Sequence, residues 1–312
     1  MATVPPPRDP GYRGRLAPSP TGYLHVGHAR TFWTAFQRAR DAGGKLVMRM
    51  EDLDPQRSRQ HFAEAAYEDL RWLGIRWQEG PDRGGPHEPY QQSERMPVYL
   101  SAWRRLYRGG YLFPCKCSRK DLEAALGAPH EISVAGVRSS GKLEPLDDEP
   151  IYPGTCRRNQ GYTPQLRGPN QTEHDTPGDM NWRFRVPDGE VIEFEDENLG
   201  PQRFVAGVDF GDFAVWRRDG TPSYQLACVA DDITMYITEV VRGADLLKST
   251  ARQILLYRAL GIAPPRWFHC RLVLDQHGRR LAKRYDALSL RALRQQGLTP
   301  MNVLGAELPL SA

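Results

Sequence analysis

The strongest constraint on the fold of this chain is an alternation of apolar runs and helical patterns near its N-terminus. A short run at 15–17 is typical of a strand and is stopped by a cluster of turn residues at 18–22. Apolar side chains then recur at spacings of three and four over 29–39, which is typical of an amphipathic helix. A second apolar run at 45–50 and a second helical pattern at 62–73 follow after short links. Strand, helix, strand and helix in this order predict a βαβ unit, a parallel sheet and an α/β fold.

The pattern further along the chain is irregular and then becomes regular again. Residues 127–180 are rich in Gly, Pro, Ser and Asp and show little periodicity, which predicts a loop-rich insertion. Beyond it we expect a β-hairpin that turns at Pro187-Asp188-Gly189, two buried strands and a helix. These elements cover 182–186 with 191–194, then 224–229, 237–241 and 249–260.

Length and composition narrow the class of protein. The 312 residues allow roughly two domains, and the first fifteen lack the apolar segment of a secretory signal. No run approaches the roughly 18 apolar residues that a membrane span requires. The five cysteines are odd in number and two stand one residue apart, so we expect no disulfide framework. A cytoplasmic protein without membrane contact is the expectation.

Charge is distributed unevenly. The net charge is +4, but residues 242–294 contain 12 Lys and Arg against 3 Asp and Glu, which is a local charge of +9. Such a segment is either a solvated helix face or a surface for a polyanion.

The segment Pro18-Ser-Pro-Thr-Gly-Tyr-Leu-His25-Val-Gly27-His28 carries the clearest chemical signal. It is a turn that enters a helix, whose free N–H groups and positive dipole end attract anions. Two imidazoles one turn apart can hydrogen-bond a polyphosphate, and Gly27 leaves room for a ring or a ribose.

His25-Val-Gly-His28 resembles the HIGH signature of class I aminoacyl-tRNA synthetases, and the string from Arg15 to His28 is similar to the glutamyl branch of that family. Three further blocks match this branch: Arg49-Met-Glu51-Asp52-Leu-Asp54, Trp72-Leu-Gly-Ile-Arg-Trp77 and Val241-Arg242-Gly-Ala-Asp-Leu246. The resemblance covers residue 15 to about residue 290. It implies a Rossmann-type parallel sheet with an inserted zinc-containing, acceptor-type domain and a short helical C-terminal segment. It also implies ATP binding by His25, Gly27 and His28, with Mg²⁺ accompanying the ATP, and a catalytic role for both histidines.

A lysine loop that steadies the triphosphate is the second nucleotide element of this family, and residues 279–284 stand in its place. Lys283 keeps the position of the second lysine, whereas Arg280 replaces the first and Ala282 replaces the serine. The positive charge survives and the polar contact of the serine does not. The resemblance makes Lys283 a candidate for catalysis and for ATP binding.

An amino acid with an acidic side chain needs a carboxylate for its α-ammonium group and a cation for its side chain. Glu51, at a strand end, is the candidate carboxylate. Arg15 and Arg242 are the candidate cations, because a guanidinium group can bind a carboxylate through two parallel hydrogen bonds. Tyr224, at the start of a predicted strand, can supply a hydroxyl group and form one wall of the amino-acid pocket. The resemblance places these residues, together with Ser19, in a glutamate pocket.

Cys115-Lys-Cys117, followed by Cys156, suggests a zinc site with three thiolate ligands, although three buried reduced cysteines can also be purely structural. From chemistry alone, His130 or His174 would be the conventional fourth ligand. The resemblance instead implies Tyr152, because short glutamyl-type members have a Cys-x-Cys…Tyr-x-x-x-Cys arrangement. A zinc ion would keep a loop-rich insertion ordered.

We expect four parts along the chain: 1–103 and 196–262 as the two halves of the catalytic domain, 104–195 as the zinc-binding insertion, and 263–312 as the lysine loop with a short helical tail. Only 285–312 follow the lysine loop, which predicts no anticodon-binding domain.

The short members of the glutamyl branch activate glutamate and attach it to the queuosine base in the anticodon of tRNA(Asp). The resemblance therefore implies three partners, which are ATP, glutamate and queuosine-containing tRNA(Asp), and we expect a monomer. Two alternatives stay open: a minimal core that charges a tRNA 3′ end, and a non-catalytic RNA-binding paralogue. The retained His25, His28, Glu51, Lys283 and Arg242 argue against the paralogue, and Ala282 is the one residue that favours it.

Overall fold

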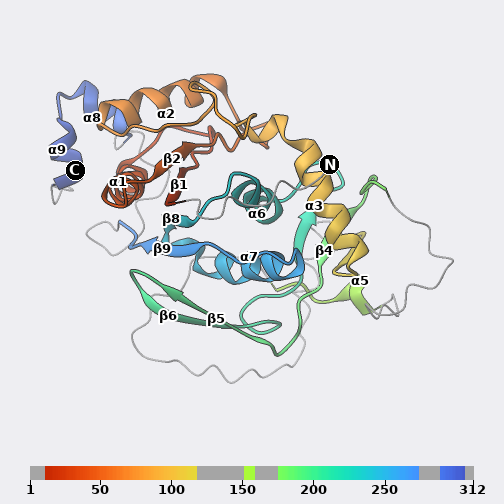
Figure 1. The fold of residues 1–312 in the computed structure, drawn as a ribbon. Helices are drawn as coiled ribbons and strands as arrows, with labels where there is room; N and C mark the ends of the chain where they lie inside the picture. The colour runs from red at the N-terminus through yellow and green to blue at the C-terminus, as the bar shows by residue number, and fades with distance from the viewer. Residues whose placement is uncertain (1–10, 118–150, 159–174, 274–288, 306–312) are drawn as a thin grey trace.

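The computed structural model describes residues 11–117, 151–158, 175–273 and 289–305. The strands are β1 (Arg13–Leu16), β2 (Lys45–Met48), β3 (Leu112–Cys115), β4 (Asn181–Phe184), β5 (Val191–Asp196), β6 (Gly200–Val205), β7 (Phe213–Trp216), β8 (Glu239–Gly243) and β9 (Arg266–Cys270). The α-helices are α1 (Val26–Asp41), α2 (Gln60–Trp72), α3 (Met96–Arg108), α5 (Thr155–Arg158), α6 (Tyr224–Thr234), α7 (Leu247–Ala259), α8 (Leu290–Gln295) and α9 (Pro300–Gly305), with 3-10 turns η1 (Gln92–Glu94) and η2 (Ala244–Leu246). Figure 1 shows their arrangement.

A largely parallel sheet lies at the centre of the molecule. β1 pairs in parallel with β2, and β9 pairs in parallel with β8 and with β5. β8 lies beside β1, where the Thr238 N–H donates to the Arg13 carbonyl at 2.9 Å. β1 and β2 form a two-stranded sheet, and β8, β9, β5 and the antiparallel edge strand β6 form a four-stranded one. The contact between β1 and β8 places the two side by side, in the spatial order β2, β1, β8, β9, β5, β6. The predicted βαβ unit is confirmed by β1, α1 and β2, and with it the α/β class.

A second, antiparallel sheet of β3, β4 and β7 packs against α3. Trp103 of α3 meets Trp182 of β4 edge-on at 5.2 Å between ring centroids and stacks on Tyr107 at 5.0 Å. This sheet carries Cys115 at the end of β3. The domain division stays a prediction, and the sheet runs across its boundary at residue 195 because β7 follows that residue.

The predicted hairpin of 182–186 with 191–194 is wrong. β4 and β5 are joined by the expected turn, but β4 pairs with β3 and β7 on its two edges, whereas β5 pairs with β6 and β9. The Val186 N–H is bound by the Asp212 carboxylate at 2.9 Å instead of by β5. The turn therefore connects two sheets, and a local pattern cannot distinguish this from a hairpin.

The predicted strand at 224–229 is also wrong, because these residues open the helix α6. Ser223 caps the helix, and its side chain accepts a hydrogen bond from the Leu226 N–H at 3.3 Å. All residues from 225 to 232 are buried. A helix that is buried on every side shows a continuous apolar run, which periodicity does not separate from a buried strand.

The predicted short helical C-terminal segment is present as α8 and α9, which lie beside α2 and α1 (Figure 1). Ser289 forms an isolated antiparallel β-bridge with His25, and the Leu290 N–H donates to the Leu24 carbonyl at 2.7 Å. The segment therefore packs next to the start of α1. Among the described residues, no helix combines the length and apolar character needed to cross a bilayer.

Candidate active site

Two histidines cap the N-terminus of α1 reciprocally. The Nδ1 of His25, the N-cap residue, accepts from the Gly27 N–H at 3.1 Å, and the His25 N–H donates to the Nδ1 of His28 at 3.2 Å. Because each Nδ1 accepts a hydrogen bond, a neutral ring carries its proton on Nε2. The rings are half-buried, with centroids 3.8 Å apart. Two Nε2–H donors at a helix N-terminus are suited to phosphate oxygens.

Gly27 is required by the packing of the first histidine ring. A Cβ at this position would lie 2.9 Å from Cε1 and 3.1 Å from Nδ1 of His25. A side chain here would therefore displace the ring that caps the helix. The space that glycine leaves is used by the protein itself, in addition to any use by a ligand.

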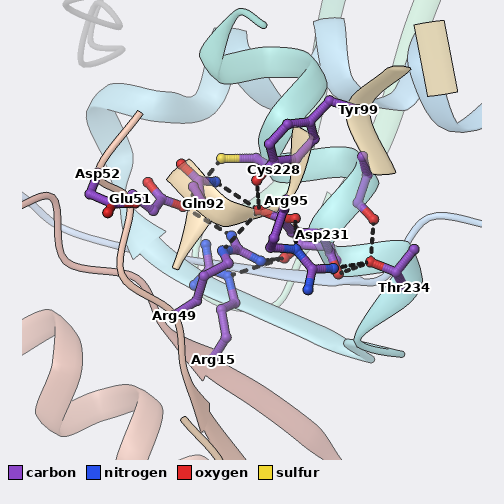
Figure 2. A network of polar contacts seen from close by, with 12 residues as sticks. Arg15, Arg49, Glu51, Asp52, Gln92, Arg95, Tyr99, Cys228, Asp231 and Thr234 are labelled. Carbon is purple, nitrogen blue, oxygen red and sulfur yellow. Dashed lines mark hydrogen bonds and ion pairs between the residues drawn. The ribbon is translucent and has the colours of Figure 1, made fainter. Parts of the chain in front are cut away.

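Glu51 follows the carboxyl end of β2, at the sheet edge where ligands bind in parallel α/β folds. Its N–H donates to the Pro18 carbonyl at 3.0 Å, which joins the segments that follow β1 and β2. Its Oε1 accepts from Arg49 Nη2 at 3.0 Å and from the Cys228 thiol at 3.4 Å. The side chain is 8% exposed. Figure 2 shows Glu51 at one side of a larger polar network.

This network of buried arginines and aspartates was missed by the sequence analysis. Arg49 donates to Asp232 at 2.6 Å and lies 3.6 Å from Asp231, while Arg95 donates to Asp231 at 2.6 Å (Figure 2). Although burial acts to lower it, the pKa of Arg49 lies well above its ordinary value because three carboxylates surround the side chain. Two further donors to Asp231 are Gln92 and Tyr99. The available signal was Asp231-Asp232 inside an apolar run, since buried carboxylates need cationic partners.

Arg242 on β8 is a buried arginine whose hydrogen-bond partners in the described part of the chain are all neutral. Its Nε donates to His269 Nε2 at 3.2 Å, Nη1 to Gln253 Oε1 at 2.9 Å and Nη2 to Thr250 Oγ1 at 2.6 Å. The residue is 4% exposed. Within the described part of the chain, no Asp or Glu oxygen lies within 4.0 Å of its guanidinium group. A buried cation held only by neutral acceptors favours binding of an anion.

Arg15, on the neighbouring strand β1, is also weakly paired. Its Nη1 donates to the Val241 carbonyl at 2.6 Å, and the nearest carboxylate oxygen, on Asp232, is 3.9 Å from its Nε. That Nε is buried and lacks a hydrogen-bond acceptor among the described residues. Arg15 and Arg242 therefore place two incompletely neutralised guanidinium groups on adjacent strands.

The remaining residues predicted for the pocket and the ATP site are Ser19, Tyr224 and Lys283. Ser19 is exposed in the loop after β1. Tyr224 is the first residue of α6 and not of a strand, and it is 39% exposed. Desolvation, and then neighbours that include Cys228 and Glu51, raise the pKa of its phenol well above the ordinary value. Lys283 lies outside the described residues.

A family model described as class I tRNA synthetases (E and Q), catalytic domain, matches residues 12–306. The chain belongs to this family of class I tRNA synthetases.

Relatives within the family differ in length. This chain is 50% identical to a Glutamyl-Q tRNA(Asp) synthetase of Symbiobacterium thermophilum over 292 residues, and 47% identical to one of Nitratidesulfovibrio vulgaris over 293. Each comparison covers 94% of this chain and 84% of the relative. A solved glutamate-tRNA synthetase from Elizabethkingia anophelis is 30% identical with a TM-score of 0.71, covering 92% of this chain and 54% of that one. This chain thus spans about half the length of that synthetase.

This member of the class I family also brings together the sulfur and oxygen donors that the sequence singled out. The Sγ atoms of Cys115, Cys117 and Cys156 all lie within 4.8 Å of one another. The Tyr152 hydroxyl is 3.5 Å from the first and 3.7 Å from the second. A tetrahedral zinc ion with Zn–S bonds of about 2.3 Å places its sulfur ligands about 3.8 Å apart, and the sulfurs of Cys117 and Cys156 are 3.6 Å apart. The donors fit a metal ion, while His130 and His174 lie outside the described residues.

Proposed function

We propose that this chain activates glutamate with ATP and transfers it to the queuosine base in the anticodon of tRNA(Asp). The observation that carries the glutamate part is Arg242, whose buried guanidinium group donates, among the described residues, only to neutral acceptors. The side-chain carboxylate of glutamate would supply the missing charge. The tRNA part is supported by the two Glutamyl-Q tRNA(Asp) synthetases that match 94% of the chain.

In this proposal the pocket binds both the α-ammonium group and the side-chain carboxylate of glutamate. Glu51 binds the α-ammonium group through Oε2, because its Oε1 is already bound by Arg49 and Cys228. Arg242 and Arg15 bind the side-chain carboxylate, and Tyr224 and Ser19 complete the wall. A neutral side chain such as that of glutamine would leave the guanidinium charges unbalanced, which provides selectivity.

ATP would bind at the N-terminus of α1. His25 and His28 donate Nε2–H to its phosphates beside Gly27, Lys283 steadies the triphosphate, and Mg²⁺ accompanies the nucleotide. The α-carboxylate of glutamate attacks the α-phosphorus, so that pyrophosphate leaves and glutamyl-adenylate forms. A hydroxyl of the queuosine base then attacks the activated carbonyl carbon, loses its proton, and AMP leaves. Positioning and electrostatics supply most of the rate.

We also propose that Cys115, Cys117, Tyr152 and Cys156 hold one zinc ion. With four protein ligands the site would be closed and structural. It would join the end of β3 to α5, which are far apart in the sequence and share a small apolar cluster.

The decisive experiment is transfer of labelled glutamate, with ATP, to tRNA prepared with and without queuosine. Labelling of the queuosine-containing pool alone is the expected result. Equal labelling of both pools would make the chain a minimal synthetase that charges a tRNA 3′ end. No labelling of either would favour a non-catalytic RNA-binding protein.

A further inference from the structure

One of the acceptors that hold Arg242 is a histidine whose own position is set by a buried aspartate. His269 on β9 stands opposite Arg242 on β8 in the parallel ladder. Its Nε2 accepts from Arg242 Nε at 3.2 Å, and its Nδ1 is 2.6 Å from Asp196 Oδ2. The side chains of His269 and Asp196 are fully buried. The pocket proposed above uses neither of them.

The direction of these hydrogen bonds follows from the chemistry of arginine. A guanidinium group only donates, so the Nε2 of His269 must be unprotonated to accept from it. The proton of the ring therefore lies on Nδ1 and is donated to Asp196. Burial, opposed by Asp196 and assisted by Arg242, lowers the pKa of His269 to about 4, which agrees with a neutral ring.

Asp196 is in turn fixed by the backbone. Its Oδ1 accepts from the N–H groups of Asn198 at 3.1 Å and Leu199 at 2.9 Å, and its Oδ2 accepts from the His269 N–H at 3.0 Å. With both oxygens bound to backbone, the carboxylate cannot rotate freely. The turn between β5 and β6 thus orients Asp196, Asp196 orients His269, and His269 contacts Arg242.

This arrangement has two consequences for Arg242. An acceptor at Nε restricts rotation of the guanidinium plane, and so sets the direction in which its other N–H groups point. The negative charge of Asp196 also stays one imidazole ring away, where it lowers the cost of burying Arg242. A carboxylate in direct contact would instead compete with an incoming carboxylate for the same donors.

We propose that His269, oriented by Asp196, is a positioning residue that sets the affinity and selectivity of Arg242 for an acidic side chain. This inference rests on the proposed role of Arg242 in glutamate binding. His269 acts through Arg242, as the partner of a metal-ligating histidine acts through that ligand.

Two substitutions separate this role from a structural one. The side-chain amide of His269→Asn lies near the position of Nδ1, so it keeps a donor for Asp196 and loses the contact with Arg242. His269→Gln reaches further and keeps an acceptor for Arg242. In glutamate transfer to queuosine-containing tRNA, we expect His269→Asn to raise the KM for glutamate about 10- to 100-fold, since the lost hydrogen bond involves a charged group. The KM for ATP stays unchanged, discrimination against glutamine falls, and His269→Gln recovers much of the loss.

The controls distinguish failure of this inference from failure of the proposed function. His87→Asn replaces a half-buried histidine whose ring contacts Tyr236 and which the proposed pocket does not use, and it should leave both KM values unchanged. Arg242→Met should raise the KM for glutamate, and His269→Asn added to it should have no further effect. If Arg242→Met leaves this KM unchanged, the proposed glutamate pocket is wrong. If Arg242→Met raises it but a folded His269→Asn does not, or raises the KM for ATP equally, the positioning role is wrong and the pocket stands.

Discussion

At the scale of single residues, Arg49 and Cys228 bind one carboxylate oxygen of Glu51, and among the described residues the other oxygen has no partner. We expect Glu51→Gln to retain an acceptor for Arg49 and Cys228 but to lose the charge that binds the α-ammonium group. The KM for glutamate should rise about 100-fold, the effect of losing a charge-assisted hydrogen bond in a buried site. Steady-state transfer kinetics measure this. Asp52→Asn, which alters the adjacent carboxylate that binds Ser93, is the matched control and should stay near wild type.

His269 makes a prediction about pH at the same scale. Its pKa is about 4 in the folded chain against 6.5 ordinarily, so the unfolded chain binds more protons between these values. The free energy of unfolding therefore falls as pH is lowered from 6.5 to 4, by up to about 3 kcal/mol, and this contribution then becomes constant. Urea unfolding at several pH values should show a shallower slope for His269→Asn. Equal slopes for variant and wild type would contradict a buried neutral ring.

At the scale of elements, the N-terminus of α1 combines helix capping with the proposed ATP site. His25→Asn keeps a capping side chain for the Gly27 N–H but loses the imidazole donor. We expect it to melt at the wild-type temperature and to lose about 100-fold in kcat. His25→Ala should lose the cap as well and cost about 1 kcal/mol of stability. If His25→Asn were as active as the wild type, the imidazole of His25 would not be part of the ATP site.

The connection between β3 and α5 is predicted to depend on zinc. Purified protein should contain one zinc ion per chain, and a chelator should lower the melting temperature. Cys117→Ser should bind less metal, whereas Cys270→Ser, on β9 and outside the cluster, should keep it. Elemental analysis and thermal melts test both points. Wild-type protein without metal, whose melting temperature a chelator leaves unchanged, would refute the zinc site.

At the scale of the whole molecule, the exposed cations of the basic segment 242–294 are expected to contact RNA phosphates. Binding of tRNA should weaken steeply as salt rises, because each phosphate contact releases counterions. Arg294→Ala, at the exposed end of α8, should reduce the slope of log affinity against log salt by about 0.7. Arg203→Ala, on the β5–β6 hairpin, is the control with the same change of charge. An unchanged slope for Arg294→Ala would place this part of the segment outside the RNA surface.

The sequence was sufficient for α1, whose helical period is unambiguous, and it also predicted α7 and β8. It was insufficient where burial removes the period, as in α6, and where one turn connects two sheets, as between β4 and β5. For the candidate site, motifs on short stretches found His25, Glu51 and Arg242 because their chemistry is encoded next to a recognisable turn or strand end. The same motifs did not indicate that His269 and Asp196 support Arg242, because neither residue stands in a motif.

By itself, the sequence determined the α/β class and the family, because both depend on residue types at short spacings. It also named the three cysteines that the structure brings together. The tertiary structure alone decided which buried charges are paired. Asp232 forms an ion pair with Arg49, which is 183 positions away in the sequence, and Asp231 forms one with Arg95, which is 136 positions away. Among the described residues, no carboxylate pairs with Arg242. Such pairing depends on the order of strands and on the face that each helix presents to the sheet. Local periodicity does not indicate either of them, and the proposed affinity of the pocket for an anion depends on both.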